Sequence, residues 1–265
     1  MLIADDAGPS DRPKSLIDGM YEAAASLLRV ADIRNRSALH GLDPFDGVAL
    51  LSTINAVVRR NYEAAGAGLN KDRSSQNWRW HVPQPQIGHR NTSPEVIIER
   101  AVTRAAADLR RTDWSNQIPV ASGLVEGAGD RRRAIDLVRR LGERHFQLIE
   151  LKIASDTPLY AAVELAGYVC LWLVARQDRP ARPSALLDAD TIDLRVLAPR
   201  AYYTRYDLRP VELAMDAGAR ALAAASGVTM TFRYNVLQEA ITADAIPAPD
   251  RLLEMMDGSE PLHRV

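Results

Sequence analysis

The sequence lacks several features that would each indicate a particular class of protein. Its single cysteine, Cys170, rules out a disulfide framework and is typical of a protein from a reducing cytoplasm. A formal net charge of −1 argues against a broad phosphate-binding surface. The longest apolar run, 165–175, is well short of the roughly 20 residues that span a bilayer, and the start of the chain has no signal-peptide core. We therefore expect a cytoplasmic globular protein with no membrane segment.

Lysine is also scarce. Of the 33 basic residues only three are lysine: Lys14, Lys71 and Lys152. Lys152 ends an apolar run, 146–153, that also contains Glu150. Lysine is a compact point charge with a tunable pKa, and arginine is neither, so a lysine at this position calls for an explanation.

Two apolar runs, 133–140 and 146–153, have the composition of neighbouring strands, and the glycine-containing segment between them is short enough for a hairpin. Residues two apart in a strand share a face, so Glu150 and Lys152 point the same way. Antiparallel pairing of the two strands can then bring Asp136 close to Glu150. The sequence predicts two carboxylates and an ammonium group side by side on a half-buried sheet.

Two half-buried carboxylates repel each other and lose solvation, and a divalent cation such as Mg²⁺ removes both costs. A lysine beside the metal can orient or deprotonate water, or stabilise charge that develops on a phosphate. The alternative is an ordinary salt bridge, in which Lys152 pairs with Glu150 or Asp136 on a solvated face of the sheet. The scarcity of lysine favours the metal site.

The rest of the chain predicts a core in the order helix, three strands, helix, strand, helix, strand. A helix begins at Ser93-Pro94, another follows Asp156, and residues 191–198 and 228–237 alternate as strands. Two amphipathic segments, 15–34 and 47–64, predict a helical hairpin ahead of this core. We expect an N-terminal helical hairpin and connector (1–90), the core (91–240), and a C-terminal tail (241–265) with a short helix and a loose end.

This arrangement resembles the PD-(D/E)xK nuclease superfamily, which has the restriction-endonuclease-like fold. Asp136 matches the acid of the second core strand, and Glu150-Leu151-Lys152 matches the E-x-K of the third, with Ile135 in place of the proline. Glu99-Arg100 resembles the helix glutamate of archaeal Holliday-junction resolvases, and Ala121-Ser122-Gly123 a segment that they carry before the acid. Residues 164–168, Glu-Leu-Ala-Gly-Tyr, are similar to the Q-x-x-x-Y motif of recombination-type nuclease domains, with Glu for Gln.

The resemblance implies an α/β fold with a mixed central sheet flanked by helices in the order αβββαβαβ. It also implies Mg²⁺-dependent hydrolysis of phosphodiester bonds in DNA, with Mn²⁺ as a substitute. Asp136, Glu150 and the Leu151 carbonyl would bind metal, Glu99 would hold a second metal or its water, and Lys152 would position the attacking water. Three residues would support this group from behind: Ser122, Glu164 and Tyr168.

Other segments leave alternatives open. Arg131-Arg132-Arg133 is the densest positive cluster and suits either phosphate contact or a solvated face. Glu164 has either a supporting role at the site or a plain core hydrogen bond to Tyr168 or Arg176. Trp78 and Trp80 suit base stacking, although packing is the favoured interpretation.

Two further classes of function compete with a nuclease. One is a catalytically inactive nuclease fold that binds nucleic acid or a protein partner. The other is an assembly protein that acts through its helical hairpin, which could cover the core, form a homodimer contact, or close over a substrate.

Overall fold

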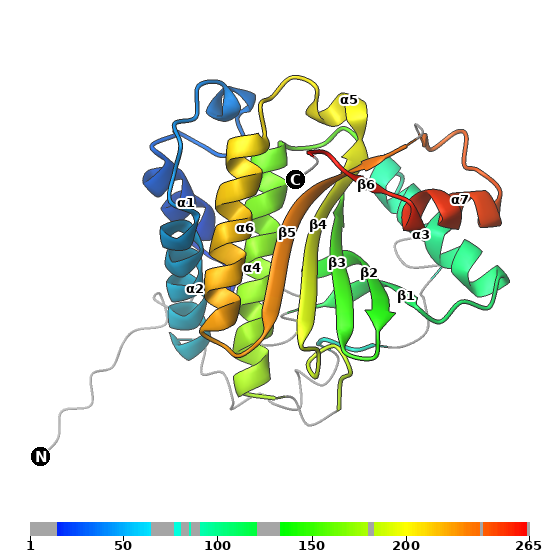
Figure 1. The fold of residues 1–265 in the computed structure, drawn as a ribbon, viewed down its shortest axis with the longest axis horizontal. Helices are drawn as coiled ribbons and strands as arrows, with labels where there is room; N and C mark the ends of the chain where they lie inside the picture. The colour runs from blue at the N-terminus through cyan, green and yellow to red at the C-terminus, as the bar shows by residue number, and fades with distance from the viewer. Residues whose placement is uncertain are drawn as a thin grey trace, which may run out of the picture.

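A mixed β-sheet lies at the centre of this computed structural model, which describes residues 15–64, 77–80, 85, 91–120, 133–179, 183–238 and 241–263 (Figure 1). The described residues form six strands that neighbour one another in chain order. The first three pair antiparallel, β3, β4 and β5 pair parallel, and β6 returns antiparallel. The strands are β1 (Trp114–Pro119), β2 (Ala134–Gly142), β3 (His145–Leu151), β4 (Thr191–Pro199), β5 (Thr229–Leu237) and β6 (Glu260–Pro261).

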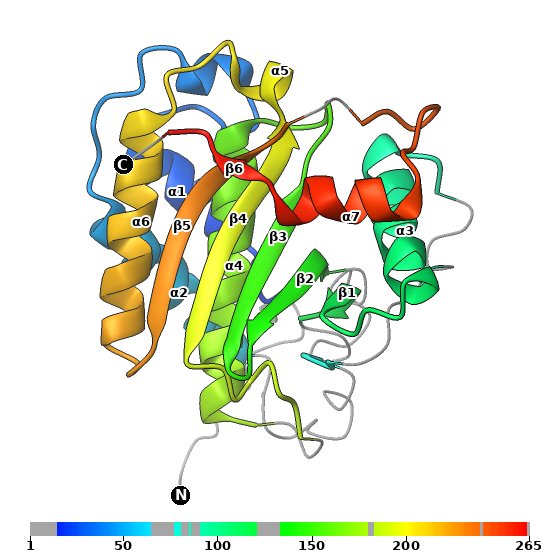
Figure 2. The same cartoon turned by 45° about the vertical axis from the view of Figure 1, so that its right-hand side comes forward.

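Helices cover both faces of this sheet. On one face lie the crossover helices α4 (Pro158–Gln177) and α6 (Arg209–Ala224), with α1 (Met20–Leu28) and α2 (Gly47–Ala64) outside them (Figure 1). On the other face α3 (Pro94–Asp108) and α7 (Pro249–Asp257) pack over the carboxyl ends of β3, β4 and β5 (Figure 2). Two short helices, η1 (Arg36–Leu39) and α5 (Arg200–Tyr203), lie at this same end of the sheet.

The predicted order of core elements is confirmed: α3, β1, β2, β3, α4, β4, α6 and β5 follow one another, with α5 as an extra turn. Two predicted helix starts are observed with their caps. The Ser93 hydroxyl accepts a hydrogen bond from Val96 N (3.4 Å) and the Thr157 hydroxyl from Tyr160 N (3.1 Å). Proline occupies the first position of both helices, where its missing N–H costs nothing. Local capping chemistry therefore determines where these helices begin.

Helix α4 is the central core helix. Every residue from Pro158 to Val174 is buried. By length and composition it is the one helix of the described ranges that is apolar enough to cross a membrane, yet 94% of its most apolar window lies inside the protein. Its hydropathy is that of a helix packed on all sides.

The two ends of the chain differ from their predictions. Helix α1 is shorter than the predicted segment 15–34, because Gly19 (φ 77°) and Arg29 (φ 56°) adopt left-handed conformations that bound it. The predicted loose C-terminal end is wrong: β6 pairs with β5, and Leu262 N donates to Tyr234 O (2.7 Å). The apolar stripe of α7 packs on α3 and joins the core.

The N-terminal helices share one hydrophobic core with the sheet. Helix α2 crosses α6 where two glycines meet, and a Cβ on Gly47 would lie 1.7 Å from the Ala214 carbonyl oxygen. Of the roles considered for this hairpin, covering the core is the one observed. Trp78 is 1% exposed and Trp80 packs edge-on against Phe146 (5.0 Å between centroids), so packing is also the observed role of the two tryptophans.

Candidate active site

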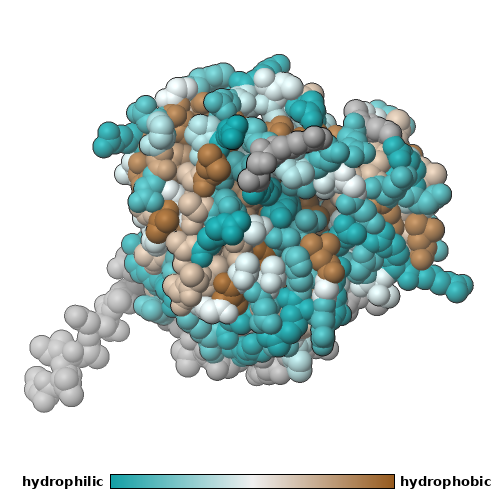
Figure 3. Space-filling model, viewed as in Figure 1, coloured by the Kyte–Doolittle hydropathy of each residue, from teal (hydrophilic) through white to brown (hydrophobic). Residues whose placement is uncertain are grey.

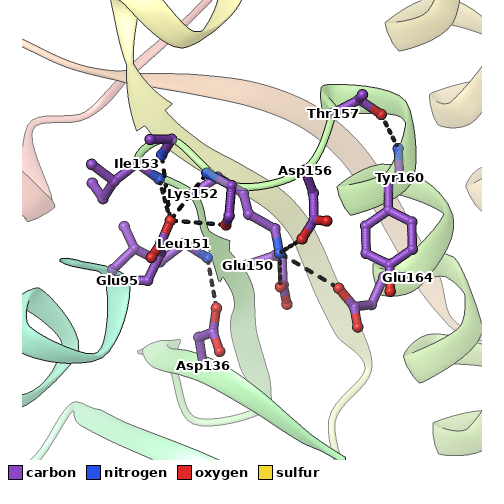
Figure 4. A network of polar contacts seen from close by, with 12 residues as sticks. Glu95, Asp136, Glu150, Leu151, Lys152, Ile153, Asp156, Thr157, Tyr160 and Glu164 are labelled. Carbon is purple, nitrogen blue, oxygen red and sulfur yellow. Dashed lines mark hydrogen bonds and ion pairs between the residues drawn. The ribbon is translucent and has the colours of Figure 1, made fainter. Parts of the chain in front are cut away.

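A polar cavity of about 430 Å³ opens at the carboxyl end of β3, on the side of the sheet that α4 covers. Its walls come from β2, β3, the β3–α4 loop and α4, and Figure 4 shows most of its charged side chains. The lining includes six of the side chains discussed below: Arg133, Asp136, Glu150, Lys152, Glu164 and Tyr168. The structure therefore brings together most of the described residues that the sequence predicted for the site.

Asp136 and Glu150 face the same cavity from neighbouring strands. The β2–β3 register pairs Leu137 with Ile149, and the next step along it places Asp136 opposite Glu150. Side chains directly opposite in an antiparallel pair point to one face. Asp136 Oδ2 also accepts a hydrogen bond from Leu151 N (3.0 Å), which draws this carboxylate to the end of β3. The predicted juxtaposition of the two acids is observed.

Glu150 has one satisfied and one unsatisfied oxygen. Its Oε1 lies 3.0 Å from Lys152 Nζ, whereas Oε2 is buried and has no hydrogen-bond partner within the described residues. Burial and then the charge of Asp136 raise the pKa of Glu150 well above its ordinary value. A buried acceptor without a donor costs about 1–3 kcal/mol, and a bound cation would remove that cost.

Lys152 is a buried cation held among carboxylates, as Figure 4 shows. Its Nζ lies 3.0 Å from Glu150, 3.4 Å from Asp156 and 3.6 Å from Glu164. Burial favours the neutral amine, but the surrounding carboxylates outweigh it and raise the pKa of Lys152. Lys152 is therefore protonated, and it suits orienting water or offsetting phosphate charge rather than removing a proton. The salt bridge to Glu150 exists, but the solvated face predicted for it is wrong, since Lys152 is 6% exposed.

Glu164 connects Lys152 to the back of the cavity. Its Oε1 accepts hydrogen bonds from the Tyr168 hydroxyl (3.1 Å) and from Arg133 (3.3 Å), while Oε2 faces Lys152. The predicted bond to Tyr168 is observed. The alternative bond to Arg176 is not, because that guanidinium donates to the Leu187 carbonyl (3.1 Å).

Of the arginine cluster, Arg133 alone lies in the described part of the chain, and it turns toward the cavity. It is not part of a solvated arginine face, because it pairs with Glu164. Ser122, Arg131 and Arg132 lie outside the described residues.

Glu99 stands behind the cavity rather than in its lining. The carboxylate is 1% exposed and accepts hydrogen bonds from the side-chain amides of Asn116 (2.8 Å) and Gln117 (3.0 Å). Burial, with the charge of Asp136, raises the pKa of Glu99 to about 8. Gln117 lines the cavity and has a left-handed backbone (φ 47°), so it separates Glu99 from the open space.

Two further acidic residues near the cavity are not among those predicted for the site. Glu95 lies in the first turn of α3. In the structure its Oε1 accepts hydrogen bonds from the backbone N–H groups of Ile153 (3.1 Å), Ala154 (3.3 Å) and Ser155 (3.4 Å), and from the Ser155 hydroxyl. Despite its burial, these bonds lower the pKa of Glu95 and hold the loop that follows Lys152. No local sequence signal marks this contact, since 58 residues separate Glu95 from Ile153.

Asp156 is the second such residue. It directly precedes Thr157, the N-cap of α4. Asp156 adopts a left-handed backbone (φ 58°) and contacts Lys152 from the β3–α4 loop. Aspartate tolerates this conformation better than most residues, and backbone strain of this kind is often found at functional sites.

Negative charge is in excess around the cavity. Four carboxylates (Asp136, Glu150, Asp156 and Glu164) line it, against two cations, Lys152 and Arg133. Within the described ranges no three His, Cys, Asp or Glu side chains form a ready-made metal group. Mg²⁺ commonly uses only one or two carboxylates and keeps several waters, so Asp136 and the unsatisfied oxygen of Glu150 fit its needs.

Comparisons with known proteins return no match for this chain among protein-family models, curated proteins or solved structures.

Proposed function

We propose that this protein is a metal-dependent nuclease that hydrolyses phosphodiester bonds in DNA, with a restriction-endonuclease-like core. One observation carries the proposal: Asp136 and Glu150 face one cavity from neighbouring strands, and a buried Glu150 oxygen without a partner lies beside a protonated Lys152. The order of core elements and the position of this cavity at the carboxyl end of a parallel strand support it.

In this proposal Asp136, Glu150 and the Leu151 carbonyl hold Mg²⁺ or Mn²⁺. A bound ion of this kind supplies Lewis-acid stabilisation of the phosphate and a lowered pKa of water. Lys152 donates hydrogen bonds to the attacking water or to a phosphate oxygen and offsets the developing negative charge. Glu164 and Tyr168 hold Lys152 in position. Glu99, beside Asp136, would hold a second ion or its water once the Gln117 amide that separates it from the cavity moves aside.

The arginine cluster Arg131-Arg132-Arg133 is a proposed set of phosphate contacts. Arg133 places positive charge on the cavity wall, and Arg131 and Arg132 precede it directly in the chain. Local clusters of this kind are the way in which a chain of net charge −1 can bind DNA. The proposal includes a cytoplasmic location and a possible homodimer.

A catalytically inactive protein of the same fold is the second candidate. The observation that favours it is that three carboxylates surround the ammonium group of Lys152 and compete with any substrate for it. Calorimetric titration with Mg²⁺ and Mn²⁺ separates the two. A nuclease binds metal in the wild type and loses binding in Asp136→Ala, whereas no binding in either protein supports the inactive candidate.

The activity itself is tested by incubating the full chain with Mn²⁺ and linear, circular, single-stranded and branched DNA. We expect the wild type to cleave at least one form and Lys152→Ala to cleave none. Cleavage that survives in Lys152→Ala at the wild-type rate would show that a contaminating nuclease or another site is responsible.

A further inference from the structure

A second cavity, of about 230 Å³, lies beside the acidic one at the same end of the sheet. Its walls come from η1, the β3–α4 loop, the start of α4, helix α5 and the turn that follows α5. The side chains that matter for the argument are Arg36, Asp156, Tyr202, Arg205 and Tyr206.

The two cavities meet at Asp156, which lines both. Tyr202 also connects them. Its hydroxyl is buried without a hydrogen-bond partner among the described residues. Burial raises the pKa of this hydroxyl, and the charges of Lys152, Asp156 and Glu150 also influence that pKa. A ligand that reaches Lys152 from the acidic cavity can therefore continue past Asp156 into the second cavity.

The two arginines of this cavity differ from the two basic side chains of the first cavity. Arg36 and Arg205 are exposed, and neither has a carboxylate within ion-pair distance in the described part of the protein. Arg133 and Lys152, by contrast, are neutralised by Glu164 and Glu150. The second cavity thus has two arginines against one carboxylate, Asp156, which itself contacts Lys152. This net positive charge suits an anionic group such as a phosphate.

The tyrosines provide fixed aromatic surfaces beside this charge. Tyr202 packs edge-on against Tyr203 (centroids 5.2 Å apart), and Tyr206 lies against His40 (5.6 Å). Such rings stack on any nucleobase, because every base has a π-face. The volume of the cavity suits one planar base rather than a paired step.

We propose that this cavity binds one unpaired nucleotide adjacent to the bond that is cleaved, with its base on Tyr202 or Tyr206 and its phosphate on Arg36 and Arg205. This inference rests on the proposed nuclease function and narrows its substrate to single-stranded nucleic acid or to strands with an unpaired end. A base held in a duplex cannot reach these rings without leaving its stack.

The test is fluorescence anisotropy of the full chain with a short labelled oligonucleotide, as single-stranded DNA, single-stranded RNA and duplex DNA, in EDTA. We expect a single strand to bind roughly tenfold or more tightly than the duplex, and the double variant Arg36→Ala/Arg205→Ala to lose roughly tenfold of that affinity. The slope of log affinity against log salt should fall by about one to two in this variant. Arg104→Ala removes one exposed arginine from α3, at a different cavity, and should bind as the wild type does.

Stacking is tested separately at Tyr206. We expect Tyr206→Ala to weaken single-strand binding by about fivefold or more, and Tyr206→Phe, which keeps the ring, to retain it. Circular dichroism and thermal unfolding confirm that each variant is folded. Equal affinity for duplex and single strand, or wild-type binding by the double arginine variant, overturns the inference.

Because these measurements contain no divalent metal, they do not depend on cleavage. Single-strand binding without Mn²⁺-supported cleavage supports the second cavity and argues against the nuclease. Cleavage of duplex DNA with no preference for single strands supports the nuclease and overturns the second cavity.

Discussion

Clusters of acidic and basic side chains lie at both ends of β3, and they differ in whether their charged atoms all have partners. At the amino end, on the open face of the sheet, Asp193 accepts hydrogen bonds from His145 (2.9 Å) and Thr231 and pairs with Arg195 (3.1 Å). Seen from this side, much of the surface over the lower sheet is hydrophilic (Figure 3). At the carboxyl end, Asp136 and Glu150 face the acidic cavity, and the Oε2 atom of Glu150 has no hydrogen-bond partner within the described residues.

The pKa values reflect this difference. Burial acts to raise the pKa of Asp193, but Arg195, Thr231 and His145 outweigh burial and hold this pKa below its ordinary value. In the acidic cavity burial raises the pKa of Asp136 to about 6, although Lys152 and the Leu151 N–H oppose the rise. A cluster that satisfies its own charges stabilises the fold, whereas one that leaves charge unsatisfied is a candidate for binding a ligand.

The largest expected effect is on catalysis. Asp136→Asn removes a proposed metal ligand, and we expect the Mn²⁺-supported cleavage rate to fall by on the order of 100-fold or more. Asp193→Asn makes the same chemical change in the satisfied cluster and should leave the rate within about threefold, once both proteins are shown to be folded. Similar losses in the two variants would remove the functional distinction between the clusters.

The same comparison predicts opposite changes in stability. Asp193→Asn weakens the bonds to His145 and Arg195, so the free energy of unfolding should drop by about 1–3 kcal/mol. Glu150→Gln removes a buried charge that repels Asp136 and places an amide donor beside it, so without metal stability should rise by about 1 kcal/mol. Urea unfolding at neutral pH measures both values, and destabilisation of equal size in both variants would contradict the prediction.

The pH dependence of stability follows from the raised pKa values of Asp136, about 6, and Glu99, about 8. The folded protein binds these protons more tightly than the unfolded chain, so ionisation costs stability as pH rises from about 4 to 8. At about 1.4 kcal/mol for each pH unit by which a pKa is raised, we expect a loss of several kcal/mol across this range without metal, and a smaller loss in Glu99→Gln. Asp193 acts in the opposite sense. Because its pKa is lowered in the folded protein, its contribution to folding stability is lost as the pH falls below the ordinary pKa of an aspartate.

Urea unfolding from pH 4.5 to pH 8 measures this dependence. A profile that is flat over this range, or identical in the wild type and Glu99→Gln, would show that ionisation of Asp136 and Glu99 does not lower the stability of the folded protein.

The smallest expected effect is stabilisation by metal. Mg²⁺ at about ten times its dissociation constant should stabilise the wild type by about 1.4 kcal/mol, or about 3–5 °C in melting temperature. Asp193→Asn should respond in the same way and Asp136→Asn should not respond. The shift should grow from pH 5.5 to pH 7.5 as Asp136 loses its proton, and thermal unfolding by differential scanning fluorimetry records each case. A shift that Asp136→Asn retains would place the metal elsewhere.

The amino-acid sequence alone was enough to predict the features that depend on local rules. Alternation along 133–140 and 146–153 with a short turn between them placed Asp136 and Glu150 on one face, because a hairpin fixes register over a few residues. The capping residue Ser93 and a helix start after Asp156 predicted where α3 and α4 begin, and the order of the core elements followed from periodicity. Spacing of one helical turn predicted the bond between Glu164 and Tyr168.

Only the tertiary structure decided what surrounds these residues. The packing of α4 over the sheet buried Lys152, which local pattern had left free to lie on a solvated face. The bond from Glu95 to the loop at 153–155, the amides that hold Glu99, and the pairing of β6 with β5 all join segments far apart in the chain. Such contacts depend on how whole elements pack, and residue spacing carries no information about that packing.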